Sequence, residues 1–200
     1  AILKQTGWLF LAQSLTRVIG FFYTIFLARN LGVSDFGLYS AAFAYFSLVS
    51  SIVDFGLNRF LVLQIALNKL KVSELLANIA IFRLTTVSVL FALFSLSLYF
   101  LDPDKLRVHI TLLLILAVLP ASLAQTFDGV FVAFHRLKYS AVSLILVSLI
   151  TASLGYFLIT YGVGLIGAAI ALIVGQLAYL VILGAILVRQ RISFIHQVTL

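Results

Sequence analysis

Long apolar runs follow one another along almost the whole chain, and most charged residues fall in the gaps between them. An α-helix rises 1.5 Å per residue, so about 20 apolar residues cross the ~30 Å hydrocarbon layer of a bilayer. The runs lack the alternation of polar and apolar residues that spanning β-strands show. We therefore expect an all-α, polytopic membrane protein. Its six spanning helices are predicted at about residues 8–28, 36–61, 79–101, 109–134, 139–160 and 165–188.

Composition excludes a soluble fold. Hydrophobic residues make up 64% of the 200 residues and charged residues only 10%, against about 45–50% and about 25% in soluble domains. A small globular domain buries only about two-thirds of the surface that its unfolded chain exposes, so it could not hide this much apolar surface. The six predicted spans leave no room for a separate soluble domain.

Lys and Arg are distributed unevenly between the two sets of loops. One set, together with the chain ends, carries eight cations: Lys4, Arg59, Lys69, Lys71, Arg136, Lys138, Arg189 and Arg191. The other set carries Arg29, Lys105 and Arg107. Because cytoplasmic loops are enriched in Lys and Arg, both ends are predicted to lie on the cytoplasmic side of a cell membrane. The net charge of +7 then reflects membrane orientation, and we expect no nucleic-acid partner.

Residues 62–78 form the one longer connection between the predicted spans. Its apolar residues recur every three or four positions, and Lys69 and Lys71 accompany them. This spacing predicts a short amphipathic helix on the cytoplasmic surface of the membrane.

Four ionisable residues, Arg17, Asp54, Arg83 and Asp128, fall inside the apolar runs. An ionised group costs a few kcal/mol or more to place in a bilayer, so each is a candidate functional residue. At 1.5 Å per residue, Arg17 and Asp54 lie at similar depth in the cytoplasmic half, and so do Arg83 and Asp128. Two ion pairs are therefore possible, one between Arg17 and Asp54 and one between Arg83 and Asp128.

Three of these charges extend into polar stripes at helical spacing. The stripes are Gln13, Arg17, Gly20 and Thr24; Ser47, Ser51, Asp54 and Asn58; and Ser122, Gln125 and Asp128. A helix face that meets lipid needs no such stripe, so we expect the stripes to face each other or a wet cavity. Two interpretations stay open. The stripes contact a substrate or a coupling ion, or their ion pairs and hydroxyls only hold helices together.

Pro120 lies midway along the run 109–134 and is a hinge candidate. It has no N–H to offer the carbonyl of Leu116, so it should kink the helix there.

Signatures of catalysis and metal binding are missing from the sequence. It has no Cys, no HExxH, no nucleotide-binding GxxxxGK[ST] and no GxSxG. The DxD of Asp102 and Asp104 stands alone in a short outer loop and is typical of a solvated turn. We therefore expect no enzyme, no metal site and no cofactor.

Three stretches of the chain are similar to those of a known family. Residues 27–40 (LARNLGVSDFGLYS) and 54–58 (DFGLN) resemble the LAR-x-LG-x-x-x-[FY]G-x-[YF] region of polysaccharide exporters, and residues 161–171 (YGVGLIGAAIA) resemble the G-x-x-GAA-x-A opening of their sixth helix. These proteins are lipid-linked oligosaccharide flippases of the multidrug/oligosaccharidyl-lipid/polysaccharide superfamily. The order and spacing of the motifs agree over residues 7–191.

The resemblance implies a fold of twelve or more helices in two lobes, with a central cavity that opens alternately to each side of the membrane. This chain would form one lobe, so we expect a missing C-terminal lobe in a longer protein or, as the alternative, a second copy. The implied cargo is a polyprenyl-pyrophosphate-linked oligosaccharide, moved from the cytoplasmic to the outer leaflet in contact with membrane lipids and a glycan polymerase or assembly complex.

In such a cavity, Arg17 is expected to grip pyrophosphate oxygens with its planar guanidinium. Gln13, Thr24, Ser47 and Asn58 are expected to bond sugar hydroxyls, and Asp54 to neutralise Arg17 or to carry H⁺ or Na⁺. Arg83 and Asp128 are secondary candidates. The alternatives are a drug or organic-cation antiporter of the same superfamily, a membrane-bound sugar transferase, and a scaffold in glycan assembly.

Overall fold

The computed structural model describes residues 2–67 and 72–198, and every regular element within these ranges is an α-helix. The helices are α1 (Ile2–Asp54), α2 (Leu57–Leu67), α3 (Val72–Leu101), α4 (Lys105–Leu116), α5 (Val118–Ala133), α6 (Leu137–Thr160) and α7 (Gly164–Val198). Five helical stretches are long and apolar enough to cross a membrane: Gly7–Leu67, Val72–Phe100, Lys105–Ala133, Leu137–Thr160 and Gly164–Arg189. The all-α prediction is confirmed, and the helices are those of a polytopic membrane protein.

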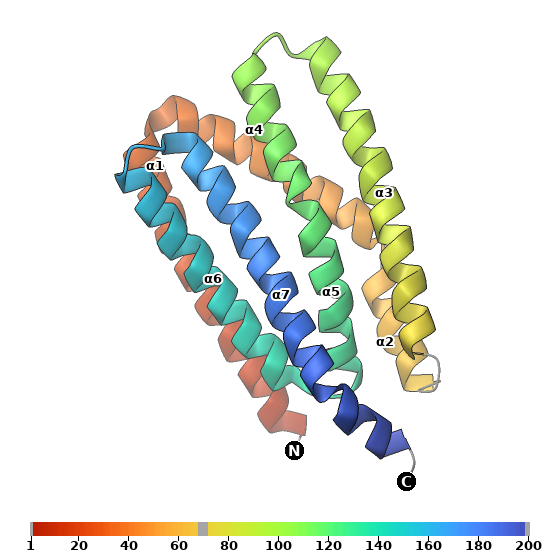
Figure 1. Cartoon of the computed structure of the whole chain (residues 1–200). Helices are drawn as coiled ribbons and strands as arrows, with labels where there is room; N and C mark the ends of the chain where they lie inside the picture. Colours follow the sequence, from red (N-terminus) through yellow and green to blue (C-terminus); the bar gives the residue numbers. More distant parts are fainter. Residues whose placement is uncertain (1, 68–71, 199–200) are drawn as a thin grey trace.

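The first of these stretches is 61 residues long and includes both of the spans expected at 8–28 and 36–61. The structure replaces the expected loop between them with one non-helical residue, Gly32, which has φ 78° and ψ 171°. Glycine reaches this conformation without the steric cost that a Cβ would impose. The chain changes direction sharply within α1 (Figure 1), which we divide into a first arm, residues 2–31, and a second arm, residues 33–54.

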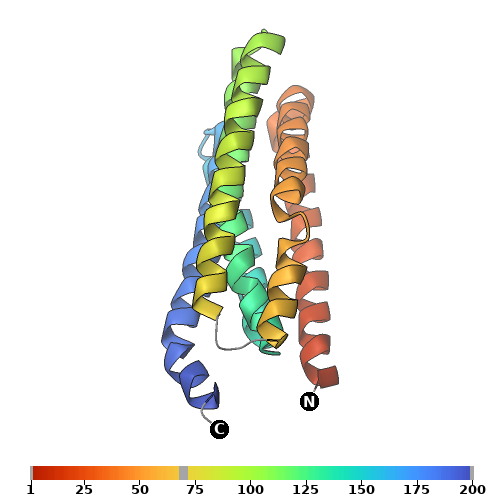
Figure 2. The ribbon, with the colours of Figure 1, turned by 90° about the vertical axis from the view of Figure 1, so that its right-hand side faces the viewer.

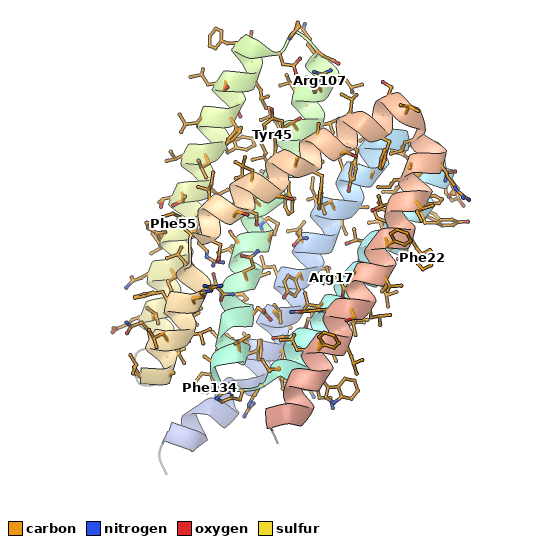
Figure 3. All side chains as sticks on the ribbon, turned by 180° about the vertical axis from the view of Figure 1, so that it is seen from behind. Arg17, Phe22, Tyr45, Phe55, Arg107 and Phe134 are labelled. Carbon is orange, nitrogen blue, oxygen red and sulfur yellow. The ribbon has the colours of Figure 1, made fainter. Side chains whose placement is uncertain are left out.

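The two arms of α1 form one layer of the molecule, and α3 and α7 lie in another (Figure 2). The first arm runs beside α6, and α7 packs between α6 and α5 (Figure 1). The second arm crosses the bundle toward α3 (Figure 3). The start of α1 and the end of α7 lie at the same end of the bundle (Figure 1).

The exposed surface is largely apolar. Phe22 on the first arm, Leu93 on α3 and Val181 on α7 each keep more than half of their surface exposed, at 65%, 57% and 65%. In water this exposure would be a liability, whereas acyl chains solvate such side chains at no cost. The charged Arg83, by contrast, is fully buried. This distribution is the one expected of helices surrounded by lipid.

The predicted helix over 109–134 is interrupted. α4 ends at Leu116, Ala117 is a turn residue whose N–H bonds the Leu114 carbonyl at 3.1 Å, and α5 starts at Val118. The break is where Pro120 was expected to cause one, because its missing N–H leaves the Leu116 carbonyl without its helical partner. The structure shows the kink, and a hinge motion there stays a prediction.

Among the described residues, the amphipathic helix expected over 62–78 is not a separate element, and its contact with the membrane surface stays a prediction. Residues 62–67 extend α2 and residues 72–78 begin α3, while Lys69 and Lys71 lie outside the described residues. Leu61 and Ile65 of α2 are buried against Ile79 of α3 and Val130 of α5. Leu63, Ala66 and Leu67, which belong to the apolar spacing of this segment, are exposed, so that face does not pack inside the bundle.

Close packing of α6 depends on small residues. A Cβ at Gly155 would meet the Tyr23 ring of the first arm, with the Cζ atom 2.6 Å away. Small residues at such positions let the backbones of neighbouring membrane helices approach closely. On α7, Ala168, Ala169 and Ala171 are fully buried for the same reason.

We predict that Gly155→Ala separates the first arm from α6 and lowers stability by about 1–3 kcal/mol, the usual cost of overpacking. Gly20→Ala is the matched control, because a Cβ at Gly20 meets nothing within 4 Å. Thermal unfolding in one detergent measures both variants. Equal melting temperatures for Gly155→Ala and the wild type would contradict the close approach.

Candidate functional site

Arg83 of α3 is the most deeply buried charge, with 0% of its side chain exposed, and it is paired with Asp54 at the end of α1. Its Nη2 donates to Asp54 Oδ1 at 2.6 Å, and its Nη1 donates to the backbone carbonyl of Ser122 on α5. The guanidinium thus connects three helices. A buried charge is tolerated only when it is paired and hydrogen-bonded, and this arrangement provides both.

The pairing differs from the one expected from depth alone, and both expected pairs are wrong. Asp54 contacts Arg83 and not Arg17, because the two arms of α1 diverge from Gly32. Arg17 lies 15 residues before that bend and Asp54 lies 22 residues after it, so they are about 22 Å and about 33 Å along different arms. Equal depth in a membrane says nothing about separation within its plane.

Arg83 and Asp128 do not meet either. Ser122, whose carbonyl binds Arg83, and Asp128 are six residues apart on α5. At 100° per residue they point about 120° apart, so Asp128 is directed away from α3. The Asp128 carboxylate lies beside the hydroxyls of Ser140 on α6 and Tyr179 on α7. Sequence reasoning missed Ser140 and Tyr179, although each is a polar residue inside an apolar run.

Arg17 is exposed, and within the described part of the chain it belongs to neither ion pair. Its side chain points into the angle between the two arms of α1, whereas Phe22 points to the opposite side of the first arm (Figure 3). Gln13 and Thr24 on the same stripe are also exposed. The first arm therefore carries one polar face with an unneutralised cation and one apolar face.

The hydroxyls of the stripes are satisfied within their own helices. Thr24 donates to the Gly20 carbonyl at 2.8 Å, Ser47 to the Phe43 carbonyl at 3.0 Å, and Ser51 to the Ser47 carbonyl at 2.8 Å. Such bonds let a hydroxyl lie on an exposed helix face without a second helix as partner. Each oxygen keeps an acceptor lone pair for a ligand or for water.

Asn58 leaves the stripe that the sequence predicted. Phe55 (φ 30°) and Gly56 (φ 82°) end α1, so Asn58 belongs to α2. Its Oδ1 is buried without a hydrogen-bond partner and lies against the backbone of Gly129 on α5. Glycine at position 56 signals this break, since a residue with φ near 80° interrupts any helical stripe.

A polar hollow of about 290 Å³ opens at this break. Ser50, Ser51, Asp54, Phe55, Gly56 and Gln125 line it. The Asp54 side chain is 33% exposed here while its other side holds Arg83. Gln125 therefore lies beside the second arm of α1 at this hollow, whereas Ser122 and Asp128 are not among the residues that line it.

We predict that Asp54→Ala lowers stability by about 3 kcal/mol, because it leaves the Arg83 guanidinium buried without a counter-charge. This expected loss of stability is at the low end of the usual range because the Asp54 side chain is 33% exposed. Arg17→Gln is the matched control and should change stability by no more than about 0.5 kcal/mol.

The double substitution Asp54→Leu with Arg83→Met should recover much of that loss, since apolar residues of similar volume can replace a buried pair. Chemical or thermal unfolding of the three variants in detergent is the measurement. Equal stability losses for Asp54→Ala and Arg17→Gln would show that the buried pair has no structural role.

The chain matches a family model described as "Polysaccharide biosynthesis protein" over residues 2–199. Searches of curated proteins and of solved structures found no match. The family match covers nearly every residue, including both arms of α1, the Arg83–Asp54 pair and the polar hollow. An all-helical chain with five stretches long and apolar enough to span a membrane, and with this match along its length, belongs to the polysaccharide biosynthesis protein family.

Proposed function

We propose that this chain is the six-span lobe of a transporter that flips polyprenyl-pyrophosphate-linked oligosaccharides from the cytoplasmic to the outer leaflet by alternating access. The observation that carries the proposal is Arg17, an exposed cation on an apolar helix with no neutralising partner among the described residues. A guanidinium in this position is costly against lipid, so its face must meet water or an anion. Membership of a polysaccharide biosynthesis family makes a lipid-linked sugar the natural anion.

A pyrophosphate cannot enter hydrocarbon alone, because transfer of an ion to low dielectric costs tens of kcal/mol in the Born limit. The planar fork of Arg17 binds two phosphate oxygens at once and offsets part of that cost. Gln13, Thr24 and Ser47 supply groups that bond sugar hydroxyls, and Asn58 is less suited because it packs against Gly129.

Asp54 has a different role from the one that its depth suggested. It is occupied by Arg83, so it leaves Arg17 free for an anionic cargo. We propose that the Arg83–Asp54 pair keeps the second arm, α3 and α5 together while the exposed stripe binds substrate. Transport of this kind forms and breaks no covalent bond, so the proposal requires neither an enzyme activity nor a cofactor.

The two arms of α1 count as separate spans in this proposal, which gives six crossings and one lobe. The polar face of the first arm would then be closed by the missing C-terminal lobe of a longer protein or by a second copy. We place the lobe in the cell membrane with both ends cytoplasmic, where its partners are membrane lipids and a glycan polymerase or assembly complex. Coupling to H⁺ or Na⁺ supplies the driving force.

We predict that Arg17→Ala lowers export by about tenfold or more, the effect expected when a hydrogen bond to a charged group worth about 1.5–3 kcal/mol is removed. Arg17→Lys should retain part of the activity, because it keeps the charge and loses the two-pronged contact. The measurement is the amount of surface polysaccharide made by a strain that lacks its own flippase. The strain expresses the variant from the complete native gene.

Arg29→Ala is the matched control, since Arg29 is exposed on the same first arm close to the bend and should leave export unchanged. Membrane levels of each variant are compared on immunoblots. Normal export by a well-expressed Arg17→Ala would remove Arg17 from the substrate path and with it the main support for this function.

A further inference from the structure

A second polar cluster lies between α5, α6 and α7, away from the exposed stripe. It consists of the Asp128 carboxylate with the hydroxyls of Ser140 and Tyr179 beside it. Ser140 is fully buried and Tyr179 is 7% exposed. The proposed transport path makes no use of these residues, and α7 is the helix that packs between the other two (Figure 1).

The carboxylate has no cationic partner. Asp128 belongs to neither ion pair found in the described residues, which join Arg83 to Asp54 and Arg107 to Asp102. This differs from Asp54, which lies in the same membrane interior and is held by a guanidinium. An ionised carboxylate buried without a compensating charge is among the costliest groups that a protein can contain.

Several oxygens of the cluster also lack hydrogen bonds. Asp128 Oδ1 and Ser140 Oγ are buried and have no hydrogen-bond partner of normal geometry. The same is true of Ser143 Oγ, one turn along α6 on a fully buried side chain. Unsatisfied buried polar atoms are rare, and several of them within two turns of one helix pair indicate a ligand.

We propose that Asp128, Ser140 and Tyr179 bind a sodium ion. Hard cations take carboxylate and hydroxyl oxygens as ligands, and these are the groups that the cluster offers. One carboxylate supplies one negative charge, which neutralises a monovalent ion and is too little for Ca²⁺, whose sites use more carboxylates and six to eight oxygens. The bound ion satisfies the charge of Asp128 and the free lone pairs in one step.

The position of the site gives it a mechanical consequence. Asp128 lies five residues before the end of α5 and Ser140 three residues after the start of α6, so the ion sits near the turn that joins them. Tyr179 brings in α7. Sodium therefore holds the end of α5 and the start of α6 to the middle of α7. A role of this ion in driving transport would rest on the proposed function, whereas its binding does not.

The test is sodium binding by the purified full chain in lipid nanodiscs, followed with ²²Na⁺ at constant ionic strength made up with choline. We expect saturable binding of about one ion per chain and a rise in melting temperature of about 5 °C at saturating Na⁺, as ligand binding to the folded state requires. Asp128→Asn should weaken binding by about tenfold or more while keeping the side-chain shape, and should abolish the sodium-dependent rise in melting temperature.

Ser140→Ala should weaken binding less than Asp128→Asn does, because one neutral ligand is lost and the charge remains. Ser153→Ala is its matched control on α6, since the Ser153 hydroxyl is exposed and bonds its own helix at Ile150. Asp104→Asn controls for the loss of a carboxylate at the surface. Both controls should bind sodium as the wild type does.

The proposal is overturned if the wild-type chain binds Na⁺ no better than choline. It is also overturned if a folded Asp128→Asn variant binds Na⁺ with the affinity of the wild type. Stabilisation by acid alone, with no response to Na⁺, also overturns it, because the carboxyl group would then be satisfied by a proton. None of these readouts depends on export, so loss of the proposed function and loss of the sodium site are separate results.

Discussion

The arrangement of this molecule depends on how charges are accommodated among helices that are otherwise apolar. Arg83 shows the constraint most clearly. Its side chain has no exposed surface, and Asp54 and the Ser122 carbonyl accept hydrogen bonds from its two terminal nitrogens, Nη2 and Nη1. These contacts fix where the second arm of α1 ends against α3 and α5. The break at Phe55 and Gly56 and the polar hollow beside Asp54 follow from that position.

The same constraint separates the two arginines into different roles. Arg83 is buried and neutralised, whereas Arg17 is exposed and unneutralised within the described residues. A structural ion pair and a binding cation would be hard to tell apart if each arginine had an aspartate. In this protein the structural pair contains Arg83, and the proposed function assigns the anionic cargo to Arg17.

Asp128 extends the argument to the remaining intramembrane charge. Its surroundings are hydroxyls rather than basic groups, and several oxygens there have no hydrogen-bond partner. The two intramembrane aspartates therefore differ in kind. Asp54 is compensated by Arg83, whereas Asp128 has the hydroxyls of Ser140 and Tyr179 beside it.

Much of the fold was predictable from the sequence because the membrane imposes it. The lengths of the apolar runs predict the helical segments, and Pro120 predicts the break between α4 and α5. The pairing of charges was not predictable, because depth along a helix does not specify which helices are neighbours. The divergence of the two arms depends on one residue, Gly32, and it alone places Arg17 and Asp54 far apart. Gly56 likewise removed Asn58 from its expected stripe.

The described residues of the segment 62–78 belong to two helices, α2 and α3. Apolar spacing of three to four residues is common to a helix on a membrane surface and to a helix packed on a protein core. Leu61 and Ile65 pack against α3 and α5, whereas Leu63 and Leu67 on the same helix are exposed. Sequence periodicity identifies that a face is apolar, and only the neighbouring helices show what covers it.

The central claim is that the face of the first arm around Arg17 meets water while the opposite face meets lipid. The chain contains no cysteine, so single cysteines report accessibility without a background signal. Thr24→Cys and Phe22→Cys lie at nearly the same depth on the two faces. The account predicts that a charged, water-soluble thiol reagent labels Thr24→Cys in native membranes and leaves Phe22→Cys unlabelled. Labelling of Phe22→Cys with Thr24→Cys unreactive would contradict it.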